Sequence, residues 1–349
     1  MHHEFYPFAD YWWFYASFIG GVLLLLVLDL VVFHKEAHEV STKEALGWTV
    51  VWTGLALLFN LGLWWWLRRD LPTHTDLMSH PDYTDLLDKL KDPALVATKL
   101  ADELSLQFLI GFLVEKSLSV DNLFVIVVIF SFFHIPAKYQ HRTLFYGIIG
   151  AIVFRGIFIA IAGELMKFEW VVYLMGAFLI VTAIKMVRGG DQKIDPDKNI
   201  VVRLTRRIFP VSTELDGDHF FTIKNGVRYA TPLFLALVFI EFTDIVFAID
   251  SIPAIFGITK EPMIVFTSNM FAILGLRNLY FLLANAVDKF HLLKWGLAIV
   301  LAFVGSKMAI LLPLHIKVPT LLSLAFILVT ITASIVLSLK FPKKPTHAA

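Results

Sequence analysis

Long apolar segments constrain this chain more than any other feature of its sequence. A transmembrane helix needs about 20 consecutive apolar residues to cross the hydrocarbon core of a bilayer. Segments of about that length occur at residues 12–33, 47–67, 104–133, 142–162, 169–187, 230–256, 263–284, 292–312 and 320–339. Hydrophobic residues make up 58% of the chain and charged residues only 17%, which excludes an ordinary soluble domain. The sequence therefore predicts an all-α membrane protein with nine transmembrane helices.

The distribution of Lys and Arg between the loops predicts the orientation of the chain. If the N-terminus lies outside, the inner loops and tail hold roughly twice as many Lys and Arg residues as the outer loops, as the positive-inside rule requires. We therefore expect the N-terminus outside and the C-terminus in the cytoplasm. Arg203, Arg206 and Arg207 in an inner loop are expected to contact anionic lipid, and nothing in their pattern requires a nucleic-acid partner.

The absence of cysteine limits the chemistry that this chain can perform. Disulfides, thiolate metal sites and thiol redox chemistry are all excluded. The twelve histidines fall in loops, tails or at the ends of the apolar segments. Any chemistry at membrane depth must therefore use carboxylates, amides, hydroxyls and the backbone.

Two apolar segments carry ionisable residues near their centres. The third reads FLIGFLVEKSLSVDNLFVIVVIF over residues 108–130 and contains Glu115, Lys116 and Asp121. The sixth includes VFIEFTDIVFAIDSIPAIF and contains Glu241, Asp244 and Asp250. A charged side chain at the bilayer centre costs at least roughly 2.5–3.5 kcal/mol, so these residues indicate a functional site.

The charges at this depth do not balance. Five acids accompany three bases, which are Lys116, Arg155 and Arg277. A divalent cation, or protons that replace it, would neutralise the excess, and a set of purely structural ion pairs is the alternative. The three bases are expected to be supporting counter-charges that hold the carboxylates when the ion has left. Pairing with backbone carbonyls or snorkelling toward the interface is the alternative for the two arginines.

The types of ligand narrow the choice of ion. Carboxylate, amide and carbonyl oxygens favour Mg²⁺, Ca²⁺ or Mn²⁺ over Cu⁺ and Zn²⁺, which prefer sulfur and imidazole. Ligand type alone does not distinguish among these three ions. No permanently bound cofactor is expected, because the ion would be the substrate.

An internal duplication relates the two segments that carry the acids. Asp121 begins DNLFVI and Asp244 begins DIVFAI. Arg155 follows Asp121 by 34 residues, and Arg277 follows Asp244 by 33. A Lys-Met pair then lies 30 residues after each arginine. Since each unit holds three spans, the second unit would enter the membrane from the opposite side, which predicts two inverted three-helix repeats. Chance similarity between apolar segments is the alternative.

The repeat divides the chain into five parts. Two helices and an outer loop (1–103) precede the first three-helix repeat (104–187), and a cytoplasmic loop (188–229) separates it from the second, inverted repeat (230–312). A final transmembrane helix and cytoplasmic tail follow (313–349). In the cytoplasmic loop, the alternation in HFFTIKNGVRYA around Asn225-Gly226 predicts a β-hairpin.

The spacing of the acids predicts distorted helices. Glu115 and Asp121 are six residues apart, as are Asp244 and Asp250, and six residues turn about 240° on a regular helix. Partners at that spacing would point apart, so a shared site requires local unwinding. We expect it near residues 117–122, and near Pro253, which lacks a backbone donor. The unwound carbonyl oxygens would also be good ligands for a hard cation.

The segments EKSLSVDN (115–122) and EFTDIVFAIDSIPAIF (241–256) resemble the signatures of the TerC family of integral membrane proteins, in particular its Alx-like members. The similarity extends to LLFNLGLWWWL at 57–67 and covers nearly the whole chain. The resemblance implies a bacterial inner-membrane protein of the LysE-like transporter superfamily, linked to Mn²⁺ export and named after tellurium resistance. It also implies a set of metal-handling residues, namely Glu115, Asp121, Asn122, Glu241, Asp244 and Asp250.

The functional hypothesis is export of a divalent cation, with Mn²⁺ favoured, by alternating access at a midplane carboxylate site, with protons exchanging for the ion. The alternatives are export of Ca²⁺ or another divalent cation, and a non-transporting scaffold for metalation or tellurium-type stress resistance. The expected partners are the metal ion and membrane lipid. No enzymatic activity is expected, because the GxGD pattern of intramembrane aspartyl proteases accompanies neither Asp121 nor Asp244.

Overall fold

The described part of the chain is mostly helical. The computed structural model describes residues 4–28, 41–74, 90, 92–188, 200–283, 292–314, 316 and 318–341. The helices are α1 (Trp12–Leu28), α2 (Thr42–Asp70), α4 (Pro93–Phe132), α5 (Ala137–Met166), α6 (Glu169–Arg188), α7 (Ile200–Ile208), α8 (Pro232–Phe256), α9 (Pro262–Leu274), α10 (Leu276–Leu283), α11 (Leu293–Ser306) and α12 (Thr320–Lys340). A 3₁₀ turn, η2 (Leu71–Thr73), follows α2, and a π-helical turn, η7 (Lys307–Leu311), follows α11. The strands are β1 (Phe221–Lys224) and β2 (Val227–Ala230).

Six helical segments in these ranges are long and apolar enough to cross a membrane: α2 with η2, α5, α6, α8, α11 with η7, and α12. The bent pair α9 and α10 would make a seventh span. α1 has 17 residues and is shorter than a full span, and the 40-residue α4 is not among the six. The all-α membrane fold is therefore confirmed, and the number of nine spans remains a prediction.

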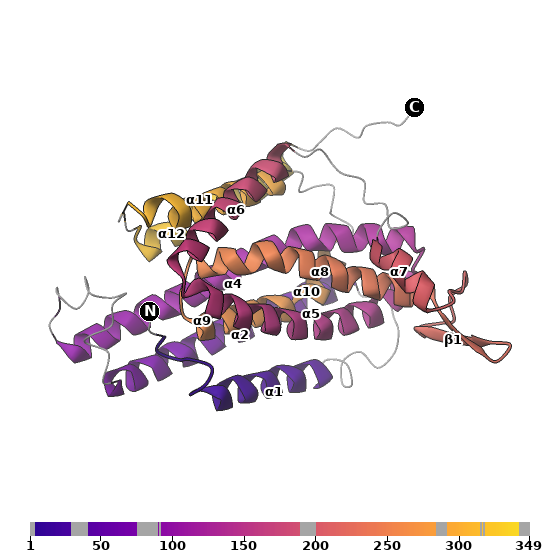
Figure 1. The fold of residues 1–349 in the computed structure, drawn as a ribbon, viewed down its shortest axis with the longest axis horizontal. Coiled ribbons are helices and arrows are strands. Elements are labelled where there is room, and N and C mark those ends of the chain that lie inside the picture. Colours follow the sequence, from indigo (N-terminus) through magenta and orange to yellow (C-terminus); the bar gives the residue numbers. More distant parts are fainter. Residues whose placement is uncertain are drawn as a thin grey trace.

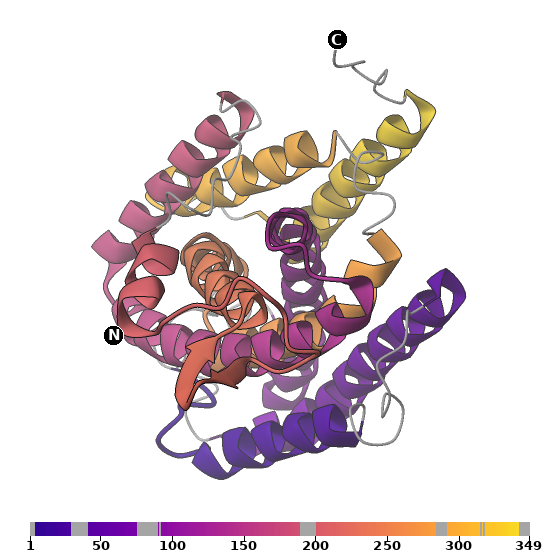
Figure 2. The ribbon, with the colours of Figure 1, turned by 90° about the vertical axis from the view of Figure 1, so that its right-hand side faces the viewer.

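α4 and α8 lie at the centre of the bundle. Figure 2 looks along the long axis of the molecule and shows both helices nearly end-on, with the others around them. In Figure 1, α6, α11 and α12 lie together on one side, and α1 lies on the opposite side. α7 and the β-hairpin occupy one end. Polar residues on the facing sides of α4 and α8 are thus shielded from lipid by the surrounding helices.

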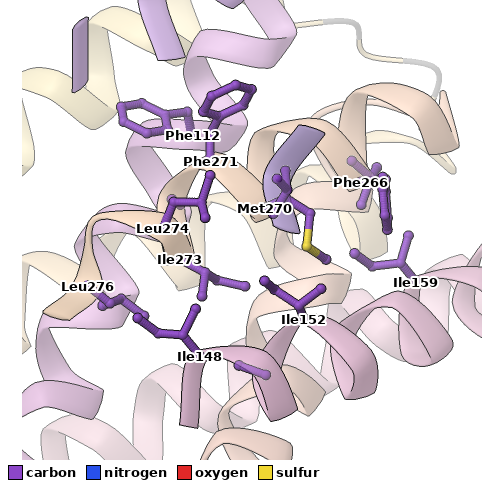
Figure 3. Close-up of a cluster of buried hydrophobic side chains, with 14 of the residues drawn as sticks. Phe112, Ile148, Ile152, Ile159, Phe266, Met270, Phe271, Ile273, Leu274 and Leu276 are labelled. Carbon is purple, nitrogen blue, oxygen red and sulfur yellow. The ribbon is translucent and has the colours of Figure 1, made fainter. Parts of the chain in front are cut away.

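The three most extensive helix pairings between the two predicted units are α4 with α9, α5 with α8, and α6 with α11. Figure 3 shows part of the apolar core, where Ile148 and Ile152 of α5 face Met270 and Ile273 of α9. These four side chains are buried, so the contact excludes lipid from the space between the two helices.

The backbones of α6 and α11 touch at two glycines. A Cβ atom on Gly305 would lie 2.7 Å from the carbonyl oxygen of Gly176, and one on Gly176 would lie 2.7 Å from the amide nitrogen of Ala309. Ala183 and Ala298 are also buried on these helices. Small residues allow close helix approach in membranes, where dispersion contacts replace the hydrophobic effect as the main attraction between helices.

The distortion expected near residues 117–122 is absent. α4 is one continuous helix from Pro93 to Phe132. The hydroxyl of Ser117 donates to the carbonyl oxygen of Leu113 at 2.7 Å without breaking the helix. That prediction was wrong, and the straight helix counts against one ion site shared by Glu115 and Asp121.

The expected break at Pro253 is also absent, and a different helix is broken. α8 continues through Pro253 to Phe256. The seventh predicted span is instead bent by 41° between α9 and α10, where Gly275 separates the two helices. A glycine weakens a helix because it lacks the Cβ that restricts the backbone. Pro253 removes one backbone hydrogen bond of α8, and the helix ends three residues later at Phe256.

The predicted hairpin is confirmed. β1 pairs with β2 in antiparallel register, with Lys224 opposite Val227. Asn225 and Gly226 form the turn with φ values of 51° and 76°, the left-handed conformation that this dipeptide favours. Residues 189–199 of the same loop lie outside the described ranges.

The substitution Gly305→Ala tests the contact between α6 and α11. Because the new methyl group would meet a backbone oxygen that cannot rotate away, we expect a loss of about 1–3 kcal/mol of stability, typical of overpacking. The measurement is the melting temperature of the purified protein in detergent. Gly20→Ala is the matched control, since no atom lies within 4 Å of the added Cβ. Equal melting temperatures for the two variants would show that the close approach is not needed.

Candidate functional site

Arg155 lies at the centre of a buried polar cluster between the two predicted units. Its side chain is 1% exposed. The guanidinium group of this α5 residue forms a bidentate pair with Asp244 of α8, with Nε 3.1 Å from Oδ2 and Nη2 2.8 Å from Oδ1. Such a fork-to-fork pair satisfies both carboxylate oxygens and fixes the orientation of both groups.

The same guanidinium group also binds a second carboxylate. Its Nη1 donates to Oε1 of Glu115 on α4, and also to Oδ1 of Asn269 on α9 at 3.3 Å. The amide of Asn269 donates to the other Glu115 oxygen at 3.2 Å. Ser119 donates to Glu115 at 3.4 Å. Four helices therefore meet through one arginine and its partners.

Asn122 completes the cluster on the side of α4. Its amide nitrogen donates to Oδ1 of Asp244 at 3.2 Å, while its own Oδ1 has no hydrogen-bond partner among the described residues. On a straight helix, Glu115, Ser119 and Asn122 share one face, because they are separated by four and three residues. The regular register of α4 thus aligns Asn122 with Glu115, without the distortion that we expected for Asp121.

Two cavities adjoin this cluster, displaced in opposite directions along α4. The first has polar lining from Glu115, Ser119, Asn122, Arg155, Asp250 and Ser251. The second is lined by Asn122, Asp244 and Arg277 among apolar residues of α4, α5, α8 and α9. From Asn122, the first cavity extends along α4 toward its N-terminus as far as Glu115, and the second extends toward its C-terminus as far as Ile126. The buried cluster therefore borders two cavities, the first with more polar residues in its lining and the second mostly apolar.

The other two acids of α8 lie apart from Arg155. Asp250 faces the first cavity and accepts a hydrogen bond from Thr182 of α6 at 3.3 Å. Glu241 faces α5, where its carboxylate occupies the space that a Cβ on residue 150 would need, so any larger residue than Gly150 would require this carboxylate to move. Oε2 of Glu241 has no hydrogen-bond partner in the described part of the chain.

Lys116 binds a backbone carbonyl at the helix break. Its Nζ donates to the carbonyl oxygen of Ala272 at 3.2 Å, beside Gly275. The ammonium group of an α4 residue therefore lies at the bend between α9 and α10. Asp121 lies on α4, but its side chain is outside the described part of the structure, so the prediction for it is untested.

The arrangement does not gather the predicted acids around one point. Within the described ranges, no group of three or more His, Asp or Glu side chains has the geometry to hold a metal ion. Glu115 and Asp244 are close, but Arg155 lies between them. In this conformation the arginine supplies the positive charge that both carboxylates bind.

Two members of the cluster, Asn269 and Ser119, were not predicted from the sequence. A TSN tripeptide (267–269) inside an otherwise apolar segment is a recognisable signal for Asn269. Ser119 stands out only as a polar residue in the same segment as Glu115. Both bind Glu115, and neither could be assigned to it without knowing which faces of α4 and α9 meet.

The substitution Arg155→Met tests the buried network. It leaves Glu115 and Asp244 buried without their shared partner, and loss of one partner of a buried ion pair typically costs about 3–5 kcal/mol. The measurement is the melting temperature in detergent, with partial recovery expected when Glu115→Gln is added. Arg142→Met is the matched control, because its partner Asp218 and Arg142 itself are each more than a third exposed. Such exposed pairs contribute about 1 kcal/mol or less. Equal destabilisation by both substitutions would contradict a stabilising role for the network.

Comparison with known proteins assigns the chain to a family. Residues 100–346 match the family described as "Integral membrane protein TerC family". An uncharacterized membrane protein of Myxococcus xanthus is 47% identical over 337 residues, which is 96% of this chain and 95% of that protein. Proteins of Salmonella typhi and Escherichia coli K12 named "Putative membrane-bound redox modulator Alx" are 41% and 40% identical, over 91% of this chain and 92% of theirs. No solved structure matches the chain. The chain belongs to the TerC family of integral membrane proteins.

Proposed function

We propose that this protein is a divalent cation transporter that exports Mn²⁺ across the bacterial inner membrane. The observation that carries the proposal is the contact of one guanidinium group with two buried carboxylates, Glu115 and Asp244. These carboxylates are close enough to share one cation. A divalent ion that bound the same oxygens would compete with Arg155 and release it.

The proposal includes alternating access. The cavities on either side of the cluster support it, because an ion held at Glu115 and Asp244 could reach each space through a small movement of Arg155 and Asn122. Transport then requires that the two cavities open to opposite sides of the membrane in turn.

The proposal also retains the inverted repeat. In the repeat, α8, α9 and α11 correspond to α4, α5 and α6. The contact of α4 with α9 in one unit therefore corresponds to the contact of α8 with α5, and both contacts are present. The contact of α6 with α11 maps onto itself. This pattern supports a pseudo-twofold axis in the membrane plane, the arrangement in which many transporters place their substrate at the repeat interface.

We propose transport of Mn²⁺ rather than a direct redox function because of the residues that the chain lacks. The named relatives are described as redox modulators. This chain has no cysteine and hence no thiol to oxidise. We therefore attribute any redox effect to the metal content of the cell, which a transporter of a redox-active ion would alter. Export of Ca²⁺ remains the alternative substrate assignment, since oxygen ligands serve both ions.

Ion flux into proteoliposomes tests this function. We expect the wild-type protein to carry Mn²⁺ faster than Ca²⁺ or Mg²⁺. Asp244→Asn keeps the shape of the side chain but removes the charge, so we expect Mn²⁺ flux to fall by about tenfold or more, equivalent to at least 1.4 kcal/mol. Asp218→Asn, at the half-exposed pair with Arg142, is the control that should retain flux.

Two results would contradict the proposal. Equal flux of all three ions through the wild type and Asp244→Asn would exclude a selective carboxylate site. Unchanged cellular Mn²⁺ content and Mn²⁺ tolerance in cells that carry Asp121→Asn and Asp244→Asn, with another phenotype persisting, would favour the scaffold.

The proposed orientation is tested by labelling, for which a cysteine-free chain is well suited. Phe8 precedes α1, and Ile223 lies in β1; both side chains are exposed. With the N-terminus outside, a membrane-impermeant maleimide should label Phe8→Cys in intact spheroplasts and Ile223→Cys only after lysis. The reverse pattern would invert the topology and the direction of export.

A further inference from the structure

Met186 brings a sulfur atom to a cavity that is otherwise lined by oxygen, nitrogen and hydrocarbon groups. The first cavity lies between α4, α5, α6, α8 and α11. Its carboxylates are Glu115 and Asp250, Asn122 and two serines add amide and hydroxyl groups, and Arg155 adds a guanidinium group that binds Glu115. Among the described residues, Met186 is the one residue of its lining that contains sulfur. The cavity therefore combines hard oxygen ligands and one positive charge with a single soft ligand.

The position of Met186 follows from its helix. Thr182 of α6 donates to Oδ1 of Asp250 at 3.3 Å, which fixes the face of α6 that is turned toward α8. Met186 lies four residues later and hence one turn further along the same face. The thioether and the Asp250 carboxylate thus border the same space.

The matching methionine is more tightly packed than this one, although both contact the same apolar cluster. Met308 occupies the equivalent position of the second unit, since each methionine follows its arginine by 31 residues. Met308 is 3% exposed, and its sulfur lies 2.7 Å from the position that a Cβ on Gly257 would take. Met186 is only partly buried and borders the cavity. The two copies of one sequence position therefore have different environments.

We propose that Met186 is a specificity-determining residue, whose thioether contacts the ion together with Asp250 in the first cavity. The inference rests on the proposed transport of a divalent cation. A thioether is a soft ligand that adds little to the binding of Ca²⁺ or Mg²⁺ but stabilises softer ions, so it favours Mn²⁺ over Ca²⁺ and favours Cd²⁺ most. Met186 thereby supplies the discrimination between Mn²⁺ and Ca²⁺ that oxygen ligands alone do not supply.

Direct binding to the full-length protein in detergent tests the contact separately from transport. Isothermal titration with CdCl₂, MnCl₂ and CaCl₂ would compare the wild type with Met186→Leu, a substitution that nearly conserves volume but removes the sulfur. We expect Cd²⁺ affinity to fall by about tenfold and Mn²⁺ affinity by about threefold, with Ca²⁺ affinity unchanged, because only the softer ions use the thioether. Met308→Leu is the matched control, for which no change in the ratio of affinities is expected.

A second substitution guards against a folding defect. Met186→Gln has similar length but offers an amide oxygen, so it should shift the preference toward Ca²⁺. The inference is overturned if the Cd²⁺ to Ca²⁺ affinity ratio of both Met186 variants equals that of the wild type, if Met308→Leu changes it as much, or if the wild type binds none of the three ions. If wild-type liposomes show no ion flux but Cd²⁺ affinity still depends on Met186, the proposed transport fails and the ion contact stands.

Discussion

The pairing of Arg155 with Glu115 and Asp244 is the interaction on which the centre of this protein depends. Burial of either carboxylate alone would cost free energy. Two carboxylates this close would also repel each other unless a positive charge lay between them. Because Arg155 comes from α5 and its partners from α4, α8 and α9, the cluster connects both predicted units. The apolar contacts between α5 and α9 hold the helices together, while this cluster defines their register.

The two units resemble each other in contacts but not in charge. With Asp121 aligned to Asp244, Val238 and Phe239 occupy the positions of Glu115 and Lys116. The second unit instead contains the break at Gly275, and Lys116 of the first unit binds the carbonyl oxygen beside it. The second unit thus lacks the charged pair and contains the helix break, while the first unit has a regular helix and supplies the cation that binds at the break. Two identical copies of either unit would not combine the cation with the break.

Sequence patterns predicted the large features because hydrophobic length and turn chemistry are local properties. The helical apolar segments and the hairpin at Asn225-Gly226 are of this kind. The partners of the acids depend on which helix faces meet, so Asn269 and Ser119 could not be assigned to Glu115. The helix break was predicted in the wrong elements, because the prediction rested on the six-residue spacing of the acids and on Pro253 and did not consider Gly275. In hydrocarbon an unsatisfied backbone group is costly, so a helix breaks only where another group can bind the backbone atoms that the break exposes. Lys116 does so by donating to the carbonyl oxygen of Ala272.

The same cluster explains why an ion could be both bound and released. An isolated pair of buried carboxylates would hold a divalent cation too tightly to let it leave, whereas Arg155 offers a competing positive charge that is always present. In the proposed transport this competition would be intramolecular, so the guanidinium group would act at a high effective concentration and lower the apparent affinity of the ion. Asn122 donates to Asp244 and borders both cavities, so this hydrogen bond would have to shift when the carboxylate moves. The net affinity of such a site is the small difference between two strong interactions, which is the condition that a transporter needs and a storage site does not.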